Sequence, residues 1–302
     1  MKHFLINILN FTILFTIVIV LLLWSTFYIC SSVSFKLPNE KNIIIVGDSR
    51  TECAIDDEIF SRAINISSSG TAYLYSYVKL RKFLAENSHV NKVLLSFSSV
   101  SINKSLDKWT IGDEYIREKL PTYYFFFYKE EISELFWVNK KAVLSAILSF
   151  PKNSLTCILK YISNKNLTYK DLRIGGYLKL DRDRLEMDIE LRKNEQPVHN
   201  EDSGVLGYQF DYLLKIIELC KTYNVELILI NTPIYNSEIY GKKNELVNYN
   251  NGYFAEVKYL YFADYPLPDN GYADITHLNY KGAEIFTQYL EDNYEMIFEK
   301  NE

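Results

Sequence analysis

The chain has 302 residues, a net charge of −5 at pH 7 and 48% hydrophobic residues. This length allows one large α/β domain, or one domain that carries a sizeable insertion. The mildly acidic balance and the absence of a basic stripe in the sequence argue against nucleic-acid binding.

The cysteines indicate neither a disulfide framework nor a metal site. Four of them are widely spaced, with no CxxC pair: Cys30, Cys53, Cys157 and Cys220. We interpret them as small buried apolar residues. Cys30 follows Ile29 rather than a small residue, which argues against a lipidated cysteine. The sequence shows no metal-ligand cluster, no phosphate-binding glycine loop and no dinucleotide fingerprint, so we expect no metal and no cofactor.

The first 30 residues predict a transmembrane helix. Residues 4–29 carry no charge, and a helix of about 20 such residues crosses a bilayer. No small-residue cleavage site follows, so an uncleaved anchor is favoured over a signal peptide. Lys2 precedes the span and Lys36 lies several residues beyond it. This bias favours an N-terminus inside and the rest of the chain outside the cytoplasmic membrane.

A connector is expected over residues 31–41, followed by an α/β domain over residues 42–302. Short β-branched runs alternate with amphipathic segments, which is typical of a parallel, doubly wound sheet. The expected strands are residues 42–46, 63–66, 92–97, 225–230 and 257–262. The expected helices are residues 52–63, 73–86, 208–223 and 280–298.

Residues 101–202 interrupt this alternation and are interpreted as a mainly helical insertion after the third strand. The aromatic run 123–128 favours core packing of this insertion, with a sugar-stacking or membrane-facing surface as alternatives. The charged run 182–193 is interpreted as a solvated helix face.

Polar residues follow the carboxyl ends of the predicted strands, where ligands gather in open parallel sheets. The first strand leads into Gly47-Asp48-Ser49-Arg50, and the last helix is preceded by Asp274-Ile275-Thr276-His277. A serine becomes a nucleophile when a base takes its proton and an acid orients that base. Of the four histidines, only His277 has a carboxylate three residues earlier, whereas His89 and His199 lie in a turn and in the charged insertion. We therefore expect Ser49, His277 and Asp274 to form a catalytic triad.

These residues resemble the SGNH/GDSL hydrolase family over residues 42–70 and 273–286. The resemblance implies a three-layer, flavodoxin-like parallel sheet. It also implies that the backbone amides of Ser49 and Gly70 bind the oxyanion of the reaction intermediate. The third block of the family usually supplies an Asn, but the third strand here ends in Ser96-Phe97-Ser98-Ser99. Ser98 or Ser99 is a candidate replacement donor, and the alternative is that the third donor is absent.

Two further residues are candidates for substrate binding. Arg50 either holds an anionic group of the substrate or pairs with Glu52 or Asp56. Asn231, at a strand end, either lines the cleft or shapes a turn.

Together, the anchor and the resemblance predict an extracytoplasmic serine esterase or O-acyltransferase that acts on acyl groups, above all acetyl groups, of a cell-surface glycan. A membrane-bound acyl donor protein is an expected partner. The alternative is a non-catalytic accessory or glycan-binding protein of an envelope polysaccharide assembly complex.

Overall fold

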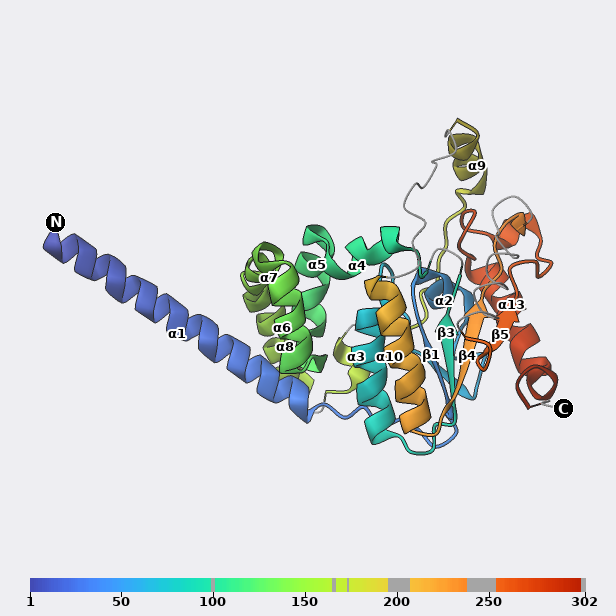
Figure 1. Cartoon of the computed structure of the whole chain (residues 1–302), viewed down its shortest axis with the longest axis horizontal. Helices are drawn as coiled ribbons and strands as arrows, with labels where there is room; N and C mark the ends of the chain where they lie inside the picture. The colour runs from blue at the N-terminus through green and yellow to red at the C-terminus, as the bar shows by residue number, and fades with distance from the viewer. Residues whose placement is uncertain (99–100, 165–166, 173, 195–206, 238–253, 300–302) are drawn as a thin grey trace. The chain divides into compact units, whose positions relative to one another are not determined.

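A computed structural model describes residues 1–98, 101–164, 167–172, 174–194, 207–237 and 254–299. The α-carbons cluster into two compact units, which are described separately. The α/β unit comprises residues 36–110 and 174–302, and the helical unit comprises residues 1–35 and 111–173. Figure 1 shows the elements of each.

The α/β unit is built on a five-stranded, all-parallel sheet in the order β2-β1-β3-β4-β5. This is the strand order of flavodoxin-like folds. The strands are β1 (Ile43–Val46), β2 (Ala63–Asn65), β3 (Lys92–Ser96), β4 (Glu226–Asn231) and β5 (Lys258–Tyr261). All four residues of β1 are fully buried, as expected for a strand covered on both faces. The predicted α/β sheet is confirmed.

Helices cover both faces of this sheet. One face carries α3 (Tyr73–Glu86) and α10 (Tyr208–Thr222), which pack side by side (Figure 1). The opposite face carries α2 (Ser49–Ala54) and α13 (Tyr280–Asp292), whose Phe286 and Leu290 join Ile43 and Ile230 in one buried cluster. The unit also contains α9 (Leu185–Asn194), the 3-10 turns η1 (Lys104–Asp107) and η4 (Asp269–Gly271), and the π-helical turn η5 (Glu295–Glu299).

The helix predicted at residues 52–63 is wrong in both bounds, because α2 begins at Ser49 and ends at Ala54. The side-chain amide of Asn65 donates to the carbonyls of Thr51 (3.0 Å) and Ile55 (2.8 Å). Carbonyls at a helix end need such outside donors, so Asn65 closes α2 where the apolar pattern alone would have continued it. The predicted last helix is also too long, since α13 ends at Asp292 before η5.

The helical unit consists of several shorter helices and one long helix. Its elements are α1 (Lys2–Ser32), α5 (Asp113–Tyr123), η2 (Tyr124–Phe126), α6 (Lys129–Val138), α7 (Lys140–Ile147), α8 (Phe150–Asn164) and η3 (Tyr169–Leu172). The short helix α4 (Lys108–Ile111) lies where the chain enters this unit. Tyr123, Phe126 and Phe127 are buried, and Phe126 packs edge-on against Phe35 (5.4 Å), so half of the aromatic run serves core packing, whereas Tyr128 is exposed.

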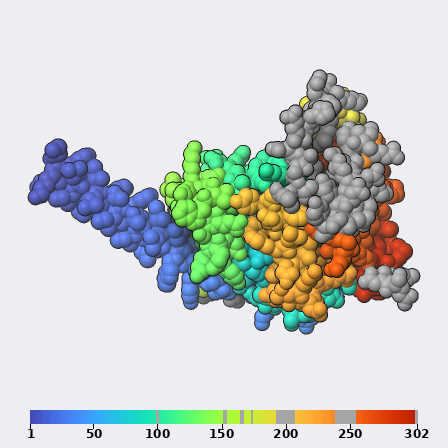
Figure 2. Space-filling model, viewed as in Figure 1, coloured from blue at the N-terminus to red at the C-terminus, as the bar shows by residue number. Residues whose placement is uncertain are grey.

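Helix α1 is long and apolar enough to cross a membrane, and a signal sequence meets the same criteria. Its 31 residues extend over about 46 Å, against about 30 Å for a bilayer core. Only Thr26, Ile29 and Cys30 are buried, all near its C-terminal end, where α1 packs on α8. The rest of α1 stands clear of the other helices of this unit (Figure 2).

Candidate active site

The turn after β1 holds Ser49 at the carboxyl edge of the sheet. Gly47 is needed here, because a Cβ at this position would lie 2.2 Å from the Cβ of Ser96. Asp48 then caps α2 by accepting a hydrogen bond from the backbone N–H of Arg50 (3.1 Å). Ser49 is the first residue of α2, so its own N–H has no acceptor within the helix.

Strand β2 fixes this turn from the side. The backbone N–H of Ser68 donates to the carbonyl of Gly47 (3.0 Å), and the Thr51 hydroxyl donates to the Ser67 hydroxyl (2.9 Å). With Asn65 at the other end of α2, the helix that begins at Ser49 is held at both ends by β2 and the segment that directly follows it.

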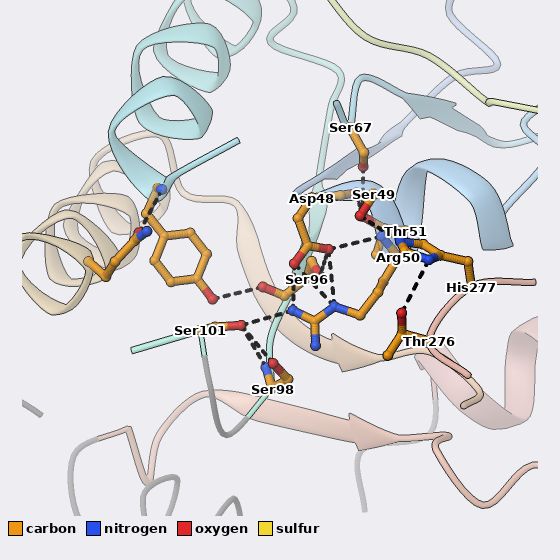
Figure 3. A network of polar contacts seen from close by, with 12 residues as sticks. Asp48, Ser49, Arg50, Thr51, Ser67, Ser96, Ser98, Ser101, Thr276 and His277 are labelled. Atoms are coloured by element: carbon orange, nitrogen blue, oxygen red, sulfur yellow. Dashed lines mark hydrogen bonds and ion pairs between the residues drawn. The ribbon is translucent and has the colours of Figure 1, made fainter. Parts of the chain in front are cut away.

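The structure brings Ser49, His277 and Asp274 into one hydrogen-bonded row. The Ser49 Oγ lies 2.8 Å from Nε2 of His277, and Nδ1 of His277 lies 2.8 Å from Oδ1 of Asp274. An ionised carboxylate only accepts hydrogen bonds, which assigns the ring proton to Nδ1 and leaves Nε2 to accept from the serine. Figure 3 shows the His277 ring beside Ser49, with Thr276 next to the ring.

The carboxylate of Asp274 accepts hydrogen bonds from other donors besides the His277 ring. Its Oδ1 accepts from the backbone N–H groups of Thr276 and His277 (3.0 Å each), and its Oδ2 accepts from Arg182 (2.6 Å). Burial raises the pKa of Asp274, but the hydrogen bonds from His277, Thr276 and Arg182 outweigh burial and hold the pKa well below its usual range. Asp274 is therefore a fixed negative charge behind His277.

Arg182 is a site residue that the sequence did not reveal. It belongs to a segment, residues 174–184, that runs along the unit, and we call this segment the strap. Backbone bonds attach the strap through Gly176 N to Ser67 O (3.0 Å), Leu178 N to Glu52 O (2.8 Å) and Arg184 N to Ala273 O (2.9 Å). Arg182 is exposed, as interpreted for residues 182–193, but it precedes α9 and bonds to Asp274. Asp188 is only partly exposed, and its carboxylate accepts from the backbone N–H of Ile275 (3.2 Å).

The loop that carries Asp274 and His277 is rigidly joined to α13. Asn279 caps α13 by accepting from the N–H groups of Lys281 (3.0 Å) and Gly282 (3.2 Å), as a helix-start residue should. Gly282 allows close packing, because a Cβ there would lie 2.1 Å from the carbonyl oxygen of Gly271. The orientation of the base is thus set by a buried helix start.

Arg50 pairs with Asp48, and not with Glu52 or Asp56. Its guanidinium donates to both Asp48 oxygens and to the Ser101 hydroxyl (3.3 Å). Burial raises the pKa of Asp48, but the charge and hydrogen bonds of Arg50 outweigh it and lower the pKa of this carboxyl below its ordinary value. The positive charge of Arg50 is therefore already balanced within the protein.

The third-strand residues belong to the same network, which Figure 3 shows beside Ser49. The Ser96 hydroxyl donates to Asp48 (2.9 Å), and the Ser101 hydroxyl accepts from the backbone N–H of Ser98 (3.0 Å). The hydroxyls of Ser98 and Ser101 are 2.9 Å apart. Ser98 thus makes its hydrogen bonds to Ser101, and Ser99 lies outside the described residues.

The other candidates take different places. Gly70 follows β2 with a φ of 61°, in the left-handed region that glycine favours. Asn231 is buried at the end of β4, where its carbonyl accepts from Phe262 (2.9 Å). His89 bonds through Nε2 to the Pro38 carbonyl (3.2 Å), and His199 lies outside the described residues. No group of three or more His, Cys, Asp or Glu side chains among the described residues is arranged to hold a metal ion.

One protein-family model matches residues 178–299, a range that includes Asp274 and His277 but not Ser49. A comparison with curated proteins gives no match. Among solved structures, one similar chain is a protein from Streptococcus pneumonia, provisionally described as a platelet activating factor. It shares 14% identity, with a TM-score of 0.36 over 93% of this chain and 98% of that one. At this TM-score, the similarity does not define the function of the chain.

Proposed function

We propose that the protein is a membrane-anchored serine esterase or O-acyltransferase of the SGNH/GDSL type, which acts outside the cytoplasmic membrane on acyl groups of a cell-surface glycan. One observation carries the proposal: Ser49 Oγ, the His277 ring and the Asp274 carboxylate are joined by two hydrogen bonds of 2.8 Å each. A serine, a base and an orienting acid in this order are the parts of a nucleophilic triad.

The reaction would begin with attack of Ser49 Oγ on the carbonyl carbon of an ester. Nε2 of His277 takes the serine proton, and Asp274 stabilises the imidazolium that forms. Collapse of the tetrahedral intermediate breaks the bond to the leaving alcohol, which receives the proton from His277. The acyl group is then bound to Ser49. Water completes a hydrolase, and a sugar hydroxyl completes a transferase, each after His277 removes its proton.

The backbone N–H groups of Ser49 and Gly70 are the proposed oxyanion donors. Ser49 stands first in α2, and the bond from Ser68 to Gly47 joins the segment before Gly70 to the nucleophile turn. Preorganised donors of this kind contribute roughly 3–4 kcal/mol each to stabilising a transition state. Because Ser98 bonds to Ser101, two donors rather than three are proposed.

The membrane location and the glycan substrate rest on α1. A chain anchored by this helix would keep its site close to the membrane, where polysaccharides are assembled from membrane-bound intermediates. A membrane-bound acyl donor protein is the partner proposed for the transferase reaction.

The alternative is a non-catalytic, glycan-binding protein of an envelope assembly complex, favoured by the absence of the family's third-block Asn. A Ser49–His277 separation beyond about 3.2 Å would have favoured this alternative. The 2.8 Å separation supports the catalytic proposal instead.

The test is labelling by a fluorophosphonate, together with hydrolysis of an acetyl ester, on the full chain in detergent. We expect wild type to label and Ser49→Ala and His277→Gln to lose labelling and turnover. Ser88→Ala and His89→Gln are matched controls at the opposite edge of the sheet, and both should behave as wild type. Equal labelling of Ser49→Ala and wild type would overturn the proposal.

A further inference from the structure

Two cysteines meet inside the helical unit. Cys30 lies in the last turn of α1, and Cys157 lies in the middle of α8. They are 127 positions apart in the chain, yet their Sγ atoms are 3.5 Å apart. The interpretation of the cysteines as buried apolar residues is confirmed for Cys30, whereas Cys157 is only half-buried.

We propose that Cys30 and Cys157 are a site of covalent modification, at which a disulfide-containing oxidant joins α1 to α8 through a cystine. A disulfide bond is about 2 Å long, so the two sulfur atoms need to approach by about 1.5 Å. Rotation of the two side chains supplies such a movement while the helices stay in place.

Packing has already brought the two helices together at this point. The only buried residues of α1 are Thr26, Ile29 and Cys30, and they lie on the turns that contact α8. Cys30 is 3% exposed and Cys157 is half-buried. The non-covalent contact therefore holds both sulfur atoms at the same place before any oxidation.

A cavity gives the oxidant access to the pair. It has a volume of about 380 Å³ and is lined by both cysteines, and by Lys160 and Asp171. The hydrogen bond from Cys30 lowers the pKa of the Cys157 thiol, burial opposes this effect, and the charge of Lys160 adds to the lowering. Cys157 is thus the more exposed sulfur and the one that ionises more readily, which are the properties of an attacking thiol.

The chemistry balances as a thiol–disulfide exchange in two steps. The Cys157 thiolate attacks one sulfur of the oxidant and forms a mixed disulfide with it, while the other sulfur of the oxidant leaves as a thiolate and takes up one proton. The Cys30 thiolate then attacks the Cys157 sulfur of the mixed disulfide and releases the second thiol. The two cysteines lose two electrons and two protons in total, and the oxidant is reduced to two thiols.

The other two cysteines provide an internal contrast. Cys53 in α2 and Cys220 in α10 are 2% and 1% exposed. Burial is the main cause that raises the pKa of each of these thiols to about 12. They belong to the α/β unit and are expected to stay reduced under the same treatment.

The experiment treats the full chain in detergent with oxidised glutathione, then denatures it and adds N-ethylmaleimide. Mass spectrometry of proteolytic fragments should show two of the four cysteines alkylated, Cys53 and Cys220, and one linked pair of fragments that contains Cys30 and Cys157. The double variant Cys53→Ser/Cys220→Ser should keep the link, whereas Cys30→Ser should lose it.

A second measurement keeps the proposal testable if a variant folds poorly. Dithiothreitol should lower the Tm of the oxidised wild-type chain by roughly 5 °C or more, because the link closes a long loop, and should leave the Tm of Cys157→Ser unchanged. Alkylation of all four cysteines after oxidation, or a link between any other pair, would overturn the proposal. Neither readout depends on Ser49, so the test of the Cys30–Cys157 link is independent of the proposed catalysis.

Discussion

The site contains two aspartate–arginine pairs, which differ in sequence separation, exposure and further partners. Asp48 and Arg50 are neighbours in sequence, and their side chains are 12% and 17% exposed. Asp274 and Arg182 are 92 positions apart, and the arginine side chain is 41% exposed. The first pair lies within the nucleophile turn, whereas in the second pair the Asp274 carboxylate also bonds to Nδ1 of His277.

The difference shows that the role of each ion pair depends on the other residues to which its aspartate bonds. Asp48 has Ser96 and the α2 backbone as further partners, so it builds the turn. Asp274 has His277 as a further partner, so it orients a base. Loss of the first pair should therefore damage stability, and loss of the second should damage catalysis.

The largest effect is expected from Asp274→Asn. The amide would present the wrong hydrogen-bonding group to Nδ1 and would not stabilise the imidazolium, so kcat should fall by about 10⁴-fold. The measurement is acetyl-ester turnover beside thermal unfolding, which reports any loss of stability separately from the loss of activity. Asp269→Asn, an exposed residue of η4, is the matched control. A fall of less than about tenfold would contradict the assigned role of Asp274.

Asp48→Asn should lower the stability of the folded protein. It leaves the buried Arg50 guanidinium without a counter-charge, and unpaired buried charges cost about 3 kcal/mol or more in stability. Denaturant unfolding of the α/β unit measures this cost, with Asp292→Asn at the surface as control. If Asp48→Asn were as stable as wild type, the pair would not be holding the turn.

The pH dependence of stability should test the contribution of Asp48. The pKa of Asp48 is lowered on folding, so its ionised form stabilises the folded state above the unfolded value of 3.8, and this stabilisation is lost as pH falls through the lowered folded pKa. The stability gap between wild type and Asp48→Asn should be constant from about pH 5 to 7 and narrow below about pH 4. A gap that changes between pH 5 and 7 would point to another titrating group.

The smallest effect is expected from Arg182→Gln. Backbone N–H groups still hold Asp274, so kcat/KM should fall roughly tenfold, or about 1.4 kcal/mol, while stability changes by less than about 1 kcal/mol because Arg182 is partly exposed. Arg184→Gln should leave both the rate and the stability unchanged.

The sequence predicted the parts of the site that local pattern can reveal. Ser49 follows a β-branched run that ends at a glycine, and His277 has a carboxylate three residues earlier, so each could be placed at the carboxyl edge of a sheet. Arg182 could not be found in this way, because its partner is 92 positions away and its neighbours are ordinary charged residues. Asn65 was missed for a similar reason, since its amide acts on a different element, the end of α2.

The same distinction explains the errors in the fold. The sheet and the bounds of α3 followed from periodicity, which reports burial within one element. The ends of α2 and α13 depend on contacts with other elements, and the hydrophobic periodicity of a single segment does not report such contacts. The contact between Cys30 and Cys157 also results from helix packing, whereas the wide spacing of the cysteines along the sequence argued against a pair.

The distance along the chain between the nucleophile and its base has a consequence for biosynthesis. Ser49 and His277 are separated by 228 positions, and the loop that carries His277 is reached only after all five strands have been synthesised. A chain that emerges from the ribosome or passes through a membrane starting at its N-terminus would expose Ser49 long before any base is present to activate it. Such a nascent chain would be chemically inert, and the proposed acyl transfer would begin only when its last helix docks.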